Sequence, residues 1–233
     1  MMPVVEPHPI HTGIYQIILE DSNQSLATMN LIPGNSVSGE RLYQIDQQEY
    51  RPWNPYHSKL AAAILRHLES FPIQLSHRIL YLGAASGTTV SHISDVIGLE
   101  GGIYAIEFSP RPLRELISKV ATLRTNVYPI LADARNPSSY QFMLEAVDCI
   151  YCDIAQPQQA KILSDNARYF LKPGKYALLA IKGRSIRSTG KLTQIFQNEI
   201  KYLRSQGFSI EQTIDLEPYH SAHLMVMARY HPL

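Results

Sequence analysis

The sequence predicts an α/β fold, in which helices cover a mostly parallel sheet and a small antiparallel β domain comes first. From residue 53 onward, continuous apolar stretches alternate with amphipathic ones, which is typical of buried parallel strands joined by helices. Residues 1–52 instead hold short runs rich in Ile, Leu and Tyr. The length of 233 residues suits one mid-sized domain with an appendage. We therefore expect a β domain at 1–52 and an α/β domain at 53–233.

The β-type runs of the N-terminal part are separated by turn-forming segments. They cover 13–21, 26–32 and 40–46, with SNQ and PGNSVSG between them. This pattern predicts a small antiparallel sheet. The residues before 13, including His8 and His11, lack it and are expected to be flexible. No charged chemistry converges in this part of the sequence.

The α/β part is read by its apolar periodicity. Strands are predicted at 78–84, 101–109, 126–133, 147–155, 175–183, 208–216 and 223–231. Helices are predicted at 58–71, 88–98, 110–123, 137–146, 157–171 and 188–206. Ligands of such sheets bind at the carboxyl ends of the strands, near the point where the strand order reverses. Residues that directly follow a strand are therefore the functional candidates.

The composition and charge limit the classes of protein that the sequence can represent. No apolar run reaches the roughly 18–20 residues of a membrane span, and the N-terminus has no secretory pattern, so a cytoplasmic protein is expected. The net charge is +1. A protein that binds nucleic acid alone usually has a clear basic excess. The balance does not exclude RNA binding, because the distribution of charge matters more than the sum, but it favours help from partners in holding RNA.

The two cysteines form a C-x-x-C pair. Cys149 and Cys152 lie in an apolar strand, where positions three apart point to opposite faces. A redox or metal pair is therefore disfavoured, and two buried reduced thiols are expected. No metal-ligand cluster is found.

The first strand is followed by a turn of small residues. Gly83 and Ala84 begin it, and the next helix starts at Thr88. Small residues let the backbone approach a ligand, and a helix start favours a carboxylate or phosphate. The spacing is G-x-x-x-G rather than the dinucleotide G-x-G-x-x-G, which disfavours a nicotinamide oxidoreductase. A tight strand–helix turn without a ligand is the plain alternative.

Two acids follow the next strands. Glu107 is placed to bind both hydroxyls of a ribose, and Phe108 beside it could stack on an adenine. Asp133 could accept a hydrogen bond from an exocyclic adenine amine. Solvated acids and a core phenylalanine are the alternatives, but the acid and the glycine turn together indicate a nucleoside site.

Two lysines and an aspartate surround the same expected cleft. Asp153 ends the fourth strand, Lys182 ends the fifth, and Lys59 starts the first helix of the domain. A buried lysine can act as a base, and an aspartate can orient it and favour its charged form. Attack of a weakly acidic ribose hydroxyl on a methyl sulfonium fits this set. Solvated lysines are the alternative.

A basic stretch follows. Between 172 and 191 there are six Lys or Arg residues and no acid. Arg184, Arg187 and Lys191 come after Lys182, in a loop that could bind phosphates or be simply solvated.

These residues resemble the fibrillarin family. EYRPWNPYHSKLAAAI, ILYLGAASGTTVSHISDVIG, IYAIEFSPR, PILADAR, CDIAQPQQAKI, LKPGKYALLAIKGRSI and LEPYHSAH carry the resemblance, over about residues 38–230. It implies a Rossmann-like class I methyltransferase with a seven-stranded sheet, an N-terminal β domain and S-adenosyl-L-methionine as cofactor. The activity implied is 2′-O-methylation of rRNA or tRNA.

The resemblance also implies roles for residues. Around the cofactor it places Thr88, Thr89, Glu107, Phe108, Asp133, Ala134, Asp153 and Gln156, beside Gly83 and Ala84 of the turn. The family's catalytic set corresponds to Lys59, Asp153, Lys182 and His223, with Glu217 a less favoured fourth member.

The family acts in box C/D particles, where guide RNA, a scaffold protein and a kink-turn-binding protein are partners. Two other hypotheses stay open. One is a stand-alone RNA 2′-O-methyltransferase, and the other a catalytically silent scaffold subunit, which the retained Lys59, Asp153 and Lys182 disfavour.

Overall fold

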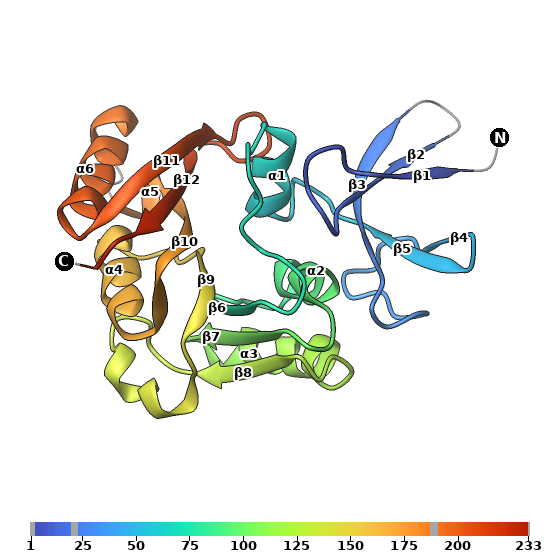
Figure 1. Ribbon diagram of the computed structural model, residues 1–233, viewed down its shortest axis with the longest axis horizontal. Coiled ribbons are helices and arrows are strands. Elements are labelled where there is room, and N and C mark those ends of the chain that lie inside the picture. Colours follow the sequence, from blue (N-terminus) through green and yellow to red (C-terminus); the bar gives the residue numbers. More distant parts are fainter. Residues whose placement is uncertain (1–2, 20–22, 187–190, 233) are drawn as a thin grey trace.

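The computed structural model of the chain describes residues 3–19, 23–186 and 191–232 and holds two sheets (Figure 1). A small N-terminal sheet packs beside a larger sheet, and helices α1 and α2 lie between the two in this view. No helix among the described residues is long and apolar enough to cross a membrane.

The N-terminal sheet has five antiparallel strands in the order β1-β2-β3-β5-β4. The expectation of a flexible start is wrong, because residues 4–7 form strand β1 and pair with β2. His11 is buried beside them and stacks on His8 at 4.5 Å between ring centroids. The run VVEP is too short, and too close to prolines, to show a strand period. The strands are β1 Val4–Pro7, β2 Tyr15–Ile18, β3 Gln24–Met29, β4 Tyr43–Ile45 and β5 Gln48–Pro52.

The larger sheet has seven strands in the order β11-β12-β10-β9-β6-β7-β8. The five strands from β10 to β8 are parallel, and β12 and β11 add an antiparallel edge. The chain order reverses between β6 and β9, which makes their carboxyl ends the expected ligand position. The strands are β6 Arg78–Leu82, β7 Gly102–Glu107, β8 Val127–Leu131, β9 Val147–Cys152, β10 Leu171–Lys182, β11 Phe208–Asp215 and β12 His223–Tyr230.

The helices differ from the predicted ones in three places. The segment after Lys182 was expected to be a loop, but it begins with the short helix Gly183–Ile186. The helix expected at 137–146 is wrong: the segment forms two 3₁₀ turns, in which Tyr140 is buried and Phe142 is 93% exposed. The buried ring of Tyr140 holds the segment against the core, and the segment lacks the apolar stripe that a helix would bury. The helix expected to reach 71 ends at Leu65, and His67 takes a positive φ of 64°. The helices are α1 Lys59–Leu65, α2 Thr88–Ile97, α3 Pro110–Leu116, α4 Gln159–Phe170, α5 Gly183–Ile186 and α6 Leu192–Ser205, and a π-helical turn, Ile117–Ala121, continues α3.

Two hydrophobic clusters cover the two faces of the large sheet. One contains residues of α1 and α2, and the other residues of α4 and α6. Cys149 belongs to the first cluster and Cys152 to the second. Both are free, fully buried thiols, as the strand alternation predicted, and burial raises the pKa of Cys152 to about 12.

Candidate active site

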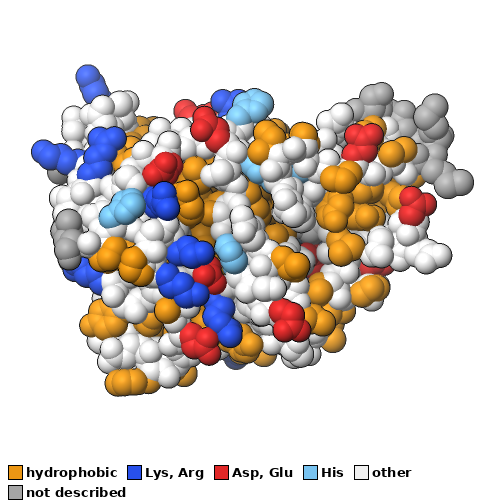
Figure 2. All heavy atoms as spheres, viewed as in Figure 1, with side chains coloured by type: hydrophobic (Ala, Val, Ile, Leu, Met, Phe, Trp, Pro, Cys, Tyr) orange, Lys and Arg blue, Asp and Glu red, His pale blue; other side chains and the backbone are white. Residues whose placement is uncertain are grey.

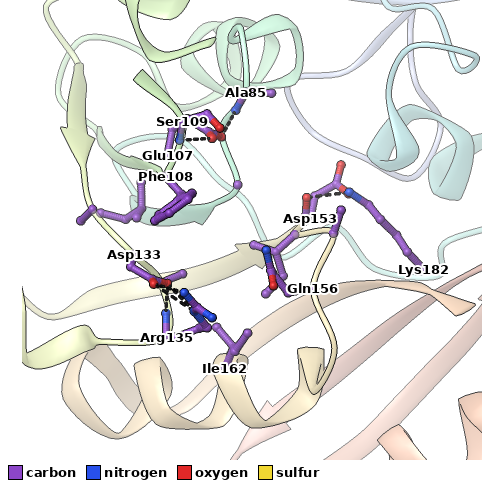
Figure 3. Close-up of a pocket in the computed structure, with 16 residues that line it drawn as sticks. Ala85, Glu107, Phe108, Ser109, Asp133, Arg135, Asp153, Gln156, Ile162 and Lys182 are labelled. Carbon is purple, nitrogen blue, oxygen red and sulfur yellow. Dashed lines mark hydrogen bonds and ion pairs between the residues drawn. The ribbon is translucent and has the colours of Figure 1, made fainter. Parts of the chain in front are cut away.

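A cavity of about 300 Å³ opens at the carboxyl ends of β6, β7, β8 and β9 (Figure 3). Its wall includes Gly83 and Ala85 of the first turn, with Glu107 and Phe108 after β7. Residues 132–135 after β8 and 153–156 after β9 complete it, together with Lys182. The cavity thus lies where the topology of the sheet predicts a ligand.

The turn after β6 requires glycine. Gly83 has a φ of +84°, and a Cβ there would lie 2.8 Å from the backbone oxygen of Asp153. The turn therefore passes directly against the end of β9. Ala84, Thr88 and Thr89 of the same turn are not among the described residues that line the cavity. Thr89 is buried and its hydroxyl donates to the Ser58 hydroxyl at 3.0 Å.

Two backbone N–H groups hold the carboxylate of Glu107. The amide of Ser109 donates to Oε1 at 2.8 Å, and the amide of Ala85 donates to Oε2 at 2.9 Å (Figure 3). Each oxygen keeps a second lone pair for another donor, so the carboxylate can accept from both hydroxyls of a ribose. The neighbouring Phe108 ring is 62% exposed on the cavity wall, where a planar ligand could stack on it.

Asp133 forms a bidentate ion pair that the sequence did not indicate. Arg135 Nη2 lies 2.6 Å from Oδ2, and Arg135 Nε donates to Oδ1 at 3.0 Å. The hydrogen bonds from Arg135 lower the pKa of Asp133. Ala134 and Arg135 also line the cavity, so this end combines an acceptor with a planar cation. The signal for Arg135 was its place directly after a predicted strand.

Lys59, Asp153 and Lys182, here called the cavity cluster, meet although they come from three elements. Lys59 Nζ lies 3.2 Å from Asp153 Oδ2, and Lys182 Nζ lies 2.9 Å from Oδ1. Lys182 Nζ also donates to the backbone oxygen of Asp153 at 2.9 Å. The side chains are 14–17% exposed. Two ammonium groups share one carboxylate, so the cluster keeps a net positive charge toward the cavity.

Two further residues, which the sequence did not single out, hold the cavity cluster. Gln159 at the start of α4 fixes the end of β10, because its Oε1 accepts from the Lys182 amide at 2.9 Å. Ser58 caps α1 by accepting from the Ala61 amide, which sets where Lys59 leaves the helix. Capping serines are recognisable from sequence, but a distant glutamine is not.

His223 lies opposite Lys182 in the β10–β12 pairing. Its Nδ1 is 2.6 Å from the backbone oxygen of Ser221, and burial lowers its pKa, so the ring is neutral at pH 7. It lines a second cavity of about 370 Å³ between α6 and the antiparallel edge, together with Glu217. The structure therefore places both candidates for the fourth member at the neighbouring cavity rather than on the first.

The basic stretch is split by β10. Lys172 and Lys175 pair with Asp148 at the start of the strand, far from the cavity end. Arg184 in α5 and Lys191 directly before α6 are exposed; Arg187 lies outside the described residues. Figure 2 shows Lys and Arg side chains over the large domain, while on this face the N-terminal sheet presents hydrophobic and acidic side chains.

Comparisons with known proteins agree with this geometry. The fibrillarin family model matches residues 5–232. A fibrillarin-like rRNA/tRNA 2′-O-methyltransferase from Pyrobaculum calidifontis is 54% identical over 97% of both chains.

Two solved structures are similar over almost the whole chain. The crystal structure of Aeropyrum pernix fibrillarin with natively bound S-adenosyl-L-methionine has a TM-score of 0.92 and 47% identity, over 98% of this chain and 100% of that one. A fibrillarin/Nop5p complex has a TM-score of 0.84 and 38% identity, over 97% and 100%.

Proposed function

The chain belongs to the fibrillarin family, and we propose from this premise that it transfers a methyl group from S-adenosyl-L-methionine to the ribose 2′-hydroxyl of rRNA or tRNA. The single observation that carries the proposal is the meeting of Lys59, Asp153 and Lys182 beside a cavity with nucleoside-binding groups. Together these supply a place for the methyl donor and a charged group for the hydroxyl that accepts the methyl.

The cavity residues fit the cofactor. Glu107 has an available lone pair on each carboxylate oxygen for the ribose hydroxyls. Phe108 offers an exposed ring to the adenine, and Asp133 offers an acceptor to the adenine amine. Gly83 lines the cavity, and the absence of a Cβ lets its turn pass directly against the end of β9. Gln156 and Ala134 line the remaining wall.

The cofactor supplies an electrophilic methyl group on a sulfonium. The residues of the chain must align the ribose oxygen with that methyl and deal with one proton. Lys182 is held by Asp153 at the cavity wall, so its ammonium or amine can meet the hydroxyl. There it removes the proton, or stabilises the negative charge that develops on the oxygen. Lys59 pairs with the second carboxylate oxygen and holds the Asp153 side chain in place.

RNA binding is proposed for the exposed cations near the end of β10. Arg184 and Lys191 follow Lys182 along the chain and would contact phosphates, which position a substrate without reading its sequence. His223 lies across from Lys182 and is the proposed fourth member of the catalytic set, at the side from which the substrate ribose would enter.

Partners are part of the proposal. A related fibrillarin forms a complex with Nop5p, and the net charge of +1 gives this chain no overall basic excess with which to hold RNA. We infer that a scaffold protein, a kink-turn-binding protein and a box C/D guide RNA present the target. A stand-alone enzyme is the second candidate.

The test is a methyl-transfer assay with S-adenosyl-L-methionine and target RNA, run with the chain alone and with the scaffold protein, the kink-turn-binding protein and the guide RNA added. We expect 2′-O-methylation only in the complete mixture, at the nucleotide that the guide selects. Methylation of naked RNA by the chain alone would support the stand-alone enzyme. No methylation in any mixture, from a protein that binds the cofactor, would favour the scaffold reading.

A further inference from the structure

A buried charged cluster joins the N-terminal sheet to the large domain. It consists of Arg51 from β5, Asp95 from α2 and Arg124 from the segment before β8, and is called the interdomain cluster below. Arg51 and Arg124 are 0% exposed and Asp95 is 1% exposed. Arg51 Nη1 donates to Asp95 Oδ2 at 2.9 Å, and Arg124 Nη1 to Oδ1 at 2.5 Å. Such a cluster fixes geometry, because each charge depends on its partners to remain buried.

One face of α2 is built to meet the N-terminal sheet. Thr88, Ser91, His92 and Asp95 have the spacing i, i+3, i+4 and i+7, so they share a side of the helix. Ser91 accepts from Arg51 at 2.9 Å, and the ring of His92 stacks on that of Trp53 at 4.9 Å between centroids.

The same sheet also reaches Asp95 directly. The hydroxyl of Thr28 in β3 donates to Asp95 Oδ2 at 2.7 Å, and the amide of Leu31 donates to Oδ1 at 3.0 Å. The N-terminal sheet therefore sets the position of α2.

Residues 36–40 extend this contact to the first residue of α2. Glu40 accepts from Arg51 Nε at 2.7 Å and from the Ser38 amide at 2.7 Å. Burial alone would raise the pKa of Glu40, but the charge of Arg51 and the hydrogen bonds outweigh it and lower the pKa to about 2. The loop is thus held in shape at neutral pH. A hydrogen bond of 3.1 Å then joins the hydroxyls of Ser38 and Thr88.

We propose that Ser38, held by Glu40 and Arg51, is a positioning residue for the amino-acid end of the cofactor. This rests on the proposed function. Glu107, Phe108 and Asp133 account for the adenosine side, and the cavity cluster for the methyl. The amino-acid end is left to the turn after β6, of which Gly83 and Ala85 line the cavity and which leads into α2 at Thr88. The N-terminal sheet is then a working part of the cofactor site, because it fixes the hydroxyl and the helix start at that end.

Calorimetry with two ligands tests this. S-adenosylhomocysteine carries the amino-acid end, and 5′-methylthioadenosine lacks it. Ser38→Ala should raise the Kd for S-adenosylhomocysteine about 3–10-fold, the range of one net hydrogen bond, and change that for methylthioadenosine less than about twofold. Ser38→Thr, which keeps the hydroxyl, should restore the affinity. Ser36→Ala is the matched control, since Ser36 donates to Glu40 in the same loop at 3.2 Å and makes no hydrogen bond to α2 within the part of the chain that the structure describes.

A double-mutant cycle removes the remaining ambiguity. If Ser38 acts through Thr88, Ser38→Ala should cost no further affinity in a Thr88→Val background. Equal losses for the two ligands, an unchanged affinity in Ser38→Ala, or a full effect in Thr88→Val would each overturn the proposal. A wild-type protein that binds neither ligand would instead contradict the proposed function, so the two failures are distinguishable. Thermal unfolding of each variant shows that it is folded.

Discussion

Two aspartates of this molecule each lie between two cationic side chains, and the two clusters differ in what surrounds them. In the interdomain cluster, Asp95 accepts hydrogen bonds from both arginines and also from Thr28 and Leu31. In the cavity cluster, Asp153 meets two lysines whose side chains are 16–17% exposed at the wall of a cavity. The interdomain cluster, in which Asp95 accepts four hydrogen bonds, has a structural role. The lysines of the cavity cluster keep N–H donors that can act on a ligand.

The first and largest expected effect concerns the cavity cluster. Lys182→Ala should lower methyl-transfer turnover by roughly 10²–10⁴-fold, the range for one acid–base group, with little change in cofactor affinity or melting temperature. Lys182→Arg should not restore turnover, because a guanidinium stays protonated and has another shape. The assay is single-turnover transfer in the reconstituted mixture, with cofactor titrations alongside.

Lys172→Ala provides the control, since Lys172 lies on the same strand and pairs with Asp148 at its far end. Equal losses of turnover and of stability in Lys182→Ala would remove the distinction between the two clusters.

The interdomain cluster should show the opposite response. Asp95→Asn removes the carboxylate that two buried arginines share and leaves Arg51 with Glu40 alone. It should lower the free energy of unfolding by about 3–5 kcal/mol. Urea denaturation measures this. Asp165→Asn is the matched control, because Asp165 also lies between two cations, Lys161 and Arg168, whose side chains are about half exposed. It should cost less than about 1 kcal/mol, and a similar cost in Asp95→Asn would contradict the structural role.

Glu107 is a third carboxylate, which accepts from backbone amides instead of cationic side chains. Its replacement should have an effect smaller than those at the two clusters. Glu107→Ala should weaken cofactor binding by about 1–3 kcal/mol, because the ribose hydroxyls lose their acceptor. Isothermal titration measures the affinity. Glu107→Gln, which keeps the shape, should lose less. Unchanged affinity in Glu107→Ala would remove Glu107 from the proposed ribose contact.

The smallest effect is a pH dependence. The pKa of Glu40 is lowered to about 2 in the folded chain, from its ordinary value of 4.5. A lowered acid pKa contributes stability that is present above about 4.5 and is lost as the pH falls toward 2. Glu40→Gln should therefore flatten the acid limb of melting temperature against pH, while making the protein less stable at pH 7. An acid limb identical to that of the wild type would show that Glu40 does not carry it.

The contrast between the clusters also explains what the sequence could predict. Glu107, Asp133, Asp153 and Lys182 all follow strands with clear apolar runs, so the topology alone brings them to one edge of the sheet. The interdomain cluster was not predicted from the sequence, because Arg51, Asp95 and Arg124 lie on separate elements. A single charged residue in a sequence usually indicates a solvated surface. The burial of these three residues depends on a domain contact that has no local period. Strand β1 was missed because its four residues are too few to show a strand period.

Residue roles remain harder to predict than positions. The turn from Gly83 to Thr89 was expected at the cofactor as one unit, but only part of it lines the cavity. The remainder faces Ser38 and Ser58, because a helix that starts at Thr88 turns successive side chains to different sides. A motif therefore specifies a backbone path, and the packing around that path decides which side chains reach the ligand.

Cys149 and Cys152, on opposite faces of β9, can report when the helices on either face separate from the sheet. β9 is the middle strand of seven, and both thiols are fully buried, so a thiol reagent reaches them only when a layer of helices separates from the sheet. With Cys152 replaced by Ala, labelling of Cys149 follows the α1–α2 face; with Cys149 replaced, labelling of Cys152 follows the α4–α6 face. The ratio of the two rates tells which layer detaches first, without any added probe.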